Sequence, residues 1–189
     1  NKKIDFSKVV TFNLDEWCGV KTNNKASFRS YMDKKFFNKT NIQKSNIHFL
    51  NGNSKNIKKM CSDYEKEIKL NGGIDLQILG LGINGHIAFN EPGTDFNSIT
   101  RRVKITDIIR KVNSKPFGSF NKVPKYGLTV GIKTIMESGK IILVAFGKDK
   151  AEAVYKSLDK KITNCVPASY LQKHKDVIFV LDKEAASKL

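Results

Sequence analysis

The chain has 189 residues, and its 34 Lys and Arg against 18 Asp and Glu give a formal net charge of +16 at pH 7. This length suits one domain, or slightly more, with a real core. No apolar run approaches the roughly 18 residues that span a bilayer, and the opening stretch 1–10 lacks the apolar centre of a secretory signal, so we expect a cytoplasmic protein without a membrane partner.

The basic residues are spread along the whole chain, and only four of the 34 are arginine. Proteins that bind nucleic acid gather Lys and Arg on one face, where they displace counterions from phosphates. We therefore favour solvated lysines and expect no nucleic-acid partner.

The three cysteines, Cys18, Cys61 and Cys165, are odd in number and far apart, and they form no C-x-x-C pair. This pattern favours reduced thiols and indicates neither a disulfide framework nor a zinc site.

The first half of the chain alternates between strand and helix patterns. Residues 8–14 form a short β-branched run, typical of a buried parallel strand, which ends at Asp15 and Glu16. A helical spacing over 27–37 and a short strand at 47–50 follow. A second helix is predicted after Asn53 and Ser54 and is stopped by 71–73; its apolar face consists of Ile57, Met60, Cys61, Tyr64 and Ile68.

The second half continues this alternation. Strands are predicted at 75–81, 140–147 and 176–182, and helices near 128–138, 149–158 and 168–174. Apolar strands that alternate with amphipathic helices predict an α/β fold with a mostly parallel sheet and helices on both faces, a Rossmann-like three-layer arrangement. No repeat or linker interrupts the chain, so we expect a single domain over 1–189.

In such sheets ligands bind beyond the carboxyl ends of the strands. Three candidate sites follow strands there: Asp15 with Glu16, the loop 80–94, and residues 148–150.

The loop contains G-x-G-x-x-G at Gly80, Gly82 and Gly85, the spacing of a dinucleotide-binding turn. Such a turn needs a helix that begins at its third glycine, because the pyrophosphate binds that helix's N–H groups. Here HIAFNEP and Gly93 follow, which leaves no room for a useful helix. The loop instead ends in His86 and Glu91. A histidine held by a carboxylate is typical of a general acid or base, although a purely structural histidine is the alternative.

Five strings carry a resemblance to a known family. They are 10-VTFNLDEW-17, 80-GLGINGHIAFNEPGT-94, 123-VPKYGLTVGI-132, 147-GKDKAEAV-154 and 167-PASYLQKH-174. In this order they resemble the motifs of the glucosamine-6-phosphate deaminase (isomerase) family, and they cover nearly the whole chain.

The resemblance implies an enzyme, classed as a hydrolase or isomerase acting on an amino sugar phosphate. It would convert glucosamine 6-phosphate and water to fructose 6-phosphate and ammonia, in amino-sugar catabolism, with no metal or organic cofactor. By their places in the motifs, Asp15 matches the base that moves a proton from C2 to C1, His86 the ring-opening residue, and Glu91 the carboxylate that orients His86. Asn84 stands where many members have an aspartate, so this relay has one carboxylate fewer.

The resemblance also implies substrate-binding residues. Lys150 matches a lysine that contacts the sugar phosphate, and Lys115 stands where an arginine is usual, without that residue's bidentate fork. Gly80 and Leu81 would offer backbone groups to the sugar. The family also has an earlier Thr-Gly-Gly-rich phosphate loop, and the chain enters the pattern after it, so we expect it to be N-terminally incomplete.

Alternatives stay open at this point. A 6-phosphogluconolactonase shares the fold and a similar loop, but the FNEP string with Glu91 favours the deaminase. A non-catalytic sugar-phosphate sensor would have no reason to keep Asp15, His86 and Glu91 together, and an inactive remnant is the third alternative.

Arg102 and Lys104 lie near an allosteric position of some members, but an exposed basic strand is favoured there. The expected partner is a small-molecule sugar phosphate, and assembly as a homo-oligomer stays open.

Overall fold

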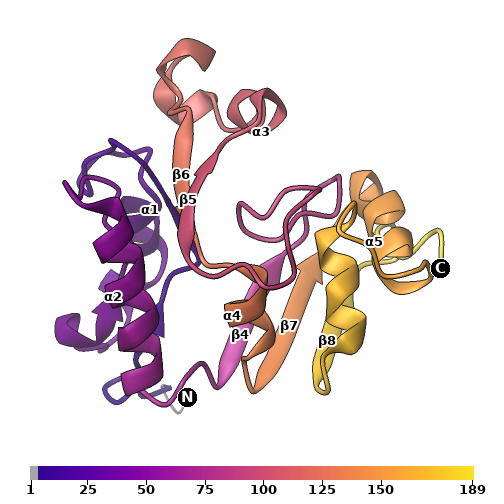
Figure 1. The fold of residues 1–189 in the computed structure, drawn as a ribbon, viewed down its shortest axis with the longest axis horizontal. Helices are drawn as coiled ribbons and strands as arrows, with labels where there is room; N and C mark the ends of the chain where they lie inside the picture. Colours follow the sequence, from indigo (N-terminus) through magenta and orange to yellow (C-terminus); the bar gives the residue numbers. More distant parts are fainter. Residues whose placement is uncertain (1–3) are drawn as a thin grey trace. The chain divides into compact units, whose positions relative to one another are not determined.

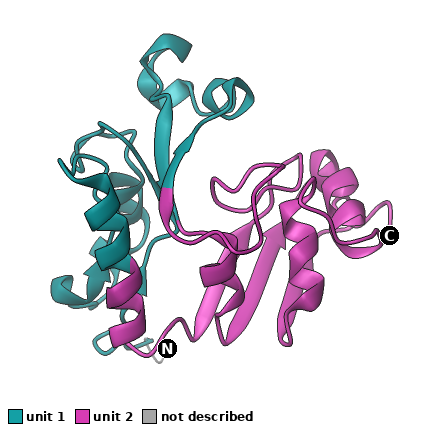
Figure 2. Cartoon of the chain, viewed as in Figure 1, with its two compact units in different colours: residues 1–64, 102–129 teal, residues 65–101, 130–189 magenta. Residues whose placement is uncertain are grey.

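The computed structural model describes residues 4–189, and the first three residues of the opening stretch lie outside the described part. The chain forms two compact units (Figure 2). The first contains the residues up to Tyr64 together with 102–129, and the second contains 65–101 together with 130–189. The single domain expected over 1–189 stays a prediction.

The first unit contains two small sheets. Strand β1 (Thr11–Phe12) pairs in parallel with β3 (Ile47–His48). Strand β2 (Asp15–Trp17) pairs antiparallel with β6 (Tyr126–Thr129). Strand β6 also neighbours β5 (Arg101–Lys104), as Figure 1 shows. The exposed basic strand expected at 101–104 is thus present, with alternate residues exposed.

The predicted single strand over 8–14 is wrong in extent, because the chain changes partners within it. The β1 ladder ends at Asn13, whose N–H donates to His48 O (3.2 Å) and whose carbonyl accepts from the Tyr64 hydroxyl (2.8 Å). Asp15 then pairs with Thr129 in the other sheet. Asp15 is therefore the first residue of a new antiparallel strand, which begins shortly after the parallel strand β1 ends.

Helices of the first unit largely follow the predicted spacing. Helix α1 (Phe28–Lys35) is capped by Ser27, whose Oγ accepts from the N–H of Ser30 (3.0 Å). Helix α2 (Ile57–Leu70) begins in this unit and continues into the second. Three residues of its predicted face, Cys61, Tyr64 and Ile68, are buried, and the other two, Ile57 and Met60, are half-buried. Helix α3 (Asp107–Val112) and the short 3-10 turns at 37–39, 44–46, 115–117 and 120–122 were not predicted.

The second unit contains a parallel sheet in the order β4 (Leu76–Gly80), β7 (Lys140–Ala145) and β8 (Val177–Leu181), as the apolar runs predict. Helix α4 (Ile132–Met136) precedes β7, and α5 (Ala151–Leu158) connects β7 to β8 together with 3-10 turns at 148–150 and 167–173. The α/β fold class with parallel strands and helices is confirmed, and the antiparallel pairing of β2 with β6 adds to it.

The helix predicted over 128–138 is wrong in its first part. Residues 126–129 are strand β6, and α4 begins only after Gly131. A Cβ at Gly131 would lie 2.1 Å from the Ser98 carbonyl oxygen, so a backbone segment passes too close there for any side chain.

The two faces of the parallel sheet differ in burial. Leu79, Ile141 and Leu143 are fully buried on one face. The alternate positions are much more open, with Ile78 60% exposed in β4 and Ile178 45% exposed in β8. A continuously apolar strand therefore does not by itself establish burial on both faces.

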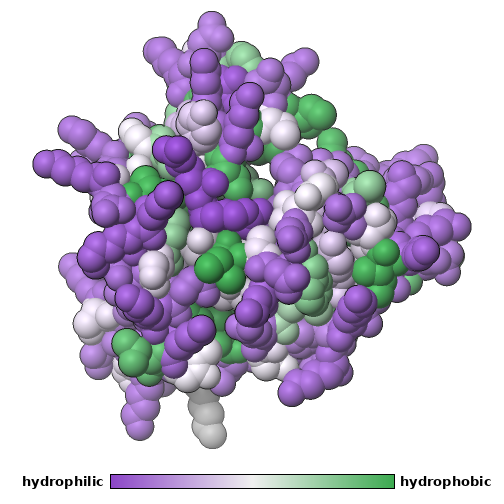
Figure 3. Space-filling view, viewed as in Figure 1, coloured by the Kyte–Doolittle hydropathy of each residue, from purple (hydrophilic) through white to green (hydrophobic). Residues whose placement is uncertain are grey.

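The surface fits the interpretation of solvated lysines. Hydrophilic residues dominate the face in Figure 3, with hydrophobic residues scattered among them. Within residues 4–189, no helix combines the length and the apolar character that a membrane crossing requires.

Candidate active site

The glycines of the loop after β4 clear space for His86. A Cβ at Gly82 would lie 2.2 Å from the imidazole ring, so only glycine lets the ring pack there. The N–H of Gly82 donates to the His86 carbonyl (2.9 Å), and that of Gly85, with φ of +82°, donates to the Gly82 carbonyl (2.9 Å). A tight turn, not a helix N-terminus, therefore follows the strand, as the sequence predicts.

Asn84, His86 and Glu91 form one hydrogen-bonded cluster in the second unit. The Nδ1 atom of His86 lies 2.7 Å from Asn84 Oδ1 and 2.9 Å from Glu91 Oε1, and Asn84 Nδ2 donates to Glu91 Oε2 (3.0 Å). The side chains of His86 and Glu91 are 18% and 19% exposed. The sequence alone could not place the amide of Asn84 between the two.

This geometry specifies the imidazole tautomer. Both partners of Nδ1 are oxygen acceptors, so Nδ1 carries the proton and Nε2 presents a lone pair. A neutral imidazole in this tautomer can accept a proton at Nε2, and the nearby carboxylate of Glu91 stabilises the positive charge that results.

Buried contacts hold the loop that carries Glu91. Asn90 is fully buried, and its Nδ2 donates to the carbonyls of Ile87 (3.0 Å) and Val130 (2.9 Å). Ala88 has φ of +52°, a conformation that costs a non-glycine residue free energy unless its surroundings impose it. The packing of the buried Ile87 and Phe89 on either side supplies that constraint.

Asp15 lies in the first unit, at the start of β2. Burial is the main cause that raises the pKa of its carboxyl group to about 7, and the charge of Glu16 is the second. A carboxylate with a proton affinity near neutrality is suited to take up and return a proton under physiological conditions.

The predicted substrate-binding residues lie in both units. Lys115 is exposed and begins the 3-10 turn 115–117 of the first unit. In the second unit, Lys150 lies 3.7 Å from Asp149, Leu81 is buried, and Gly80 is the last residue of β4. Because Asp15 and Lys115 belong to one unit and the other site residues to the second, their convergence on one hexose stays a prediction.

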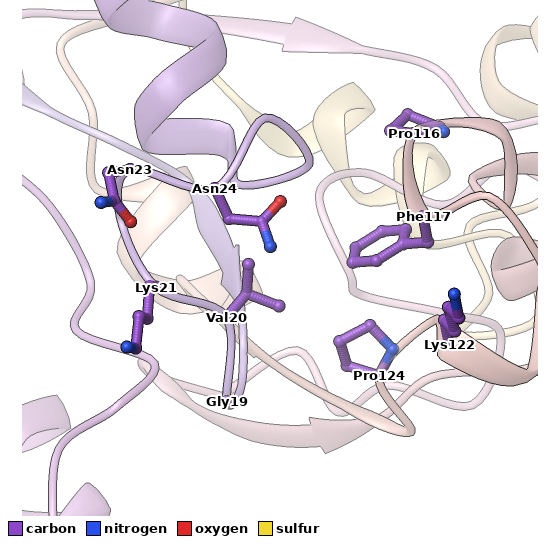
Figure 4. A pocket seen from close by; sticks show the side chains of 9 residues that line it. All are labelled: Gly19, Val20, Lys21, Asn23, Asn24, Pro116, Phe117, Lys122 and Pro124. Carbon is purple, nitrogen blue, oxygen red and sulfur yellow. The ribbon is translucent and has the colours of Figure 1, made fainter.

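The first unit also contains a pocket of about 460 Å³. Two segments line it, residues 19–24 and 116–124, and in Figure 4 the rings of Phe117 and Pro124 lie opposite Val20 and Asn24. Phe117 also contacts Trp17 edge-on, with ring centroids 5.5 Å apart. The turn that carries Lys115 is thereby packed against the strand that carries Asp15. No local pattern in the sequence indicates this contact.

The comparison with family models matches residues 1–180 to the glucosamine-6-phosphate isomerases/6-phosphogluconolactonase family. The chain belongs to this family. All 189 residues of the chain match two curated proteins, both named glucosamine-6-phosphate deaminase, and the match covers 78% of the length of each. The one from Clostridium novyi is 51% identical and the one from Clostridium botulinum 50% identical.

Solved structures agree with this assignment. A monomeric glucosamine-6-phosphate deaminase superposes with a TM-score of 0.95 at 42% identity, over 98% of this chain and 77% of that one. A 6-phosphogluconolactonase from Thermotoga maritima superposes with a TM-score of 0.73 at 24% identity, over 96% and 76%, and supports the fold alone. The predicted family is confirmed. These names support a deaminase and isomerase and give no support to the hydrolase class.

Proposed function

We propose that this protein is a glucosamine-6-phosphate deaminase, which converts glucosamine 6-phosphate and water to fructose 6-phosphate and ammonia. The names of relatives about half identical to the chain support this reaction over lactone hydrolysis. The observation that carries the proposal is the cluster of His86 with two oxygen acceptors on Nδ1, because ring opening of a pyranose needs a group that moves a proton between sugar oxygens.

In the proposed mechanism, Nε2 of His86 takes the proton of the anomeric hydroxyl as the bond between C1 and the ring oxygen breaks, and it delivers that proton to the ring oxygen. Glu91 and Asn84 keep the imidazole in the required tautomer, and the carboxylate of Glu91 stabilises the imidazolium. The neutral amide of Asn84 adds orientation without adding charge.

Asp15 is the proposed base for the isomerisation step. Its carboxylate takes the C2 proton to give an enolamine and returns a proton at C1, which leaves an imine at C2. Water then adds to C2 and ammonia leaves, so that the ketone of fructose 6-phosphate forms. The raised pKa of Asp15, about 7, supports this role because both directions of transfer must be fast near neutrality. A carboxylate with an ordinary proton affinity would be a weaker base.

Lys115 and Lys150 are the proposed partners of the phosphate, as point charges without a bidentate fork. Gly80 and Leu81 would contribute backbone groups, which suits the buried side chain of Leu81. The partner is a small-molecule sugar phosphate; we also propose a cytoplasmic location and no nucleic-acid partner.

The test is an ammonia-release assay of the native protein with glucosamine 6-phosphate, beside an assay of 6-phosphogluconolactone hydrolysis. We expect ammonia and fructose 6-phosphate in stoichiometric amounts and no lactone hydrolysis above the spontaneous rate. Lactone hydrolysis without ammonia release would replace the proposal with a lactonase. Substrate binding without either reaction would favour a sensor.

A further inference from the structure

Glu16, the residue after Asp15, has an unusually well-satisfied carboxylate for a buried acid. The residue is 1% exposed. Its oxygens accept from the backbone N–H groups of Trp17 (2.8 Å), Phe28 (3.0 Å) and Arg29 (2.9 Å). Burial raises the pKa of the Glu16 carboxyl group above its ordinary value, and the three backbone N–H donors lower it and so offset part of that effect.

Two of these donors belong to the first turn of helix α1, where negative charge is favourable. That helix already has a local cap in Ser27, so Glu16 is not needed to begin it. The guanidinium of Arg29 is directed to Asp33 (3.0 Å), so the backbone, and not an ion pair with Arg29, holds Glu16. The contact therefore links strand β2 to a helix that follows 12 or 13 residues later.

Strand β2 needs such a link. It has only three residues and pairs on one side, with β6, at the edge of its sheet. Strands this short are held weakly by their ladder alone. Glu16 is the middle residue, so its contact with α1 fixes the backbone on which Asp15 stands.

On the basis of the proposed role of Asp15, we propose that Glu16 is a positioning residue: it anchors β2 to the N-terminus of α1 and thereby fixes the direction of the Asp15 carboxylate. Its negative charge also helps to raise the pKa of Asp15, after burial as the main cause. A variant without that charge should therefore lower the pKa of Asp15. Since the base must be deprotonated, the acid limb of the kcat–pH profile should then move to lower pH.

The test compares Glu16→Gln with Ser27→Ala, which removes the other cap of the same helix turn and leaves the link to β2 intact. Both should lower Tm. For Glu16→Gln we expect kcat to fall about 10-fold or more, KM to change by less than about twofold, and the acid limb to move to lower pH. Ser27→Ala should keep the wild-type kcat and profile. If Glu16→Gln behaves like Ser27→Ala, Glu16 is only a helix cap and the proposal is wrong.

Two further measurements keep the proposal testable. If Glu16→Gln does not fold, Glu16→Asp is tested instead, because it retains the charge on a shorter side chain. An intermediate kcat would support Glu16 as the anchor of β2, and a wild-type kcat would overturn that role. Titration of Asp15 by carboxyl NMR needs no activity. If the wild type releases no ammonia, the proposed function fails, yet a lower Asp15 pKa in Glu16→Gln still supports the link, and an unchanged pKa refutes it.

Discussion

Nδ1 of His86 lies 2.9 Å from a carboxylate oxygen of Glu91, and the amide of Asn84 contacts both residues. The amide of Asn84 accepts from the imidazole through Oδ1 and donates to Glu91 Oε2 through Nδ2, so each end of the amide matches the group that it meets. This complementarity gives a direct test, because the carboxylate and the amide can be exchanged between positions 84 and 91.

Glu91→Gln should lower kcat about 100-fold, because an amide at position 91 brings a donor against the Asn84 amide and removes the charge beside His86. In the double variant Asn84→Asp with Glu91→Gln, the carboxylate stands at position 84 and every hydrogen bond can form again. We expect at least a tenfold recovery of kcat relative to Glu91→Gln. Steady-state kinetics of the wild type, Asn84→Asp, Glu91→Gln and the double variant measures this coupling. Strictly additive losses of kcat would mean that the cluster does not act as a unit.

His86→Gln should impair ring opening specifically. We expect a loss of about 10²- to 10⁴-fold with the cyclic substrate, the usual range for a missing general acid or base. An open-chain substrate analogue bypasses the step and should lose much less. Equal losses on both substrates, measured as kcat/KM, would assign His86 another role.

Gly82→Ala should displace the imidazole, because the new methyl group would lie 2.2 Å from the ring. We expect the Nδ1–H resonance of His86 to move or disappear and ammonia release to fall about 100-fold. Gly80→Ala is the matched control for the resonance, since a Cβ there meets nothing within 4 Å. An unchanged His86 resonance in Gly82→Ala would show that the ring can rearrange without loss.

Asp15→Asn should stabilise the fold at alkaline pH. Burial raises the pKa of Asp15 to about 7 from its ordinary value of 3.8, so the native state favours the protonated form. This contribution to stability is fully present below pH 3.8 and is lost as the pH rises through about 7, up to an upper bound of about 4 kcal/mol. The neutral amide avoids the loss. Thermal melts should therefore show a Tm advantage of Asp15→Asn at pH 8 that shrinks toward pH 4, and a constant difference would contradict the raised pKa.

The sequence predicts well those elements that have strong local patterns. The spacing of Cys61, Tyr64 and Ile68 places the buried face of α2, and Gly72 and Gly73, both with positive φ, end it as expected. The parallel strands β4, β7 and β8 follow from their apolar runs.

Other features depend on contacts between residues distant in the sequence. Strand β2 exists because Asp15 pairs with Thr129, more than a hundred positions later, and no local pattern indicates that partner. The link from Glu16 to Phe28 is of the same kind. The motif located His86 and Glu91, but only the folded turn shows that Asn84 bridges them.

The central claim is that Asp15 moves the C2 proton, and the most direct measurement is deuterium uptake at C2 of glucosamine 6-phosphate in D₂O, compared between the wild type and Asp15→Asn. We expect exchange and ammonia release in the wild type. In Asp15→Asn, exchange should be lost while substrate binding, measured by calorimetry, persists. Exchange at the wild-type rate in Asp15→Asn would contradict the mechanism.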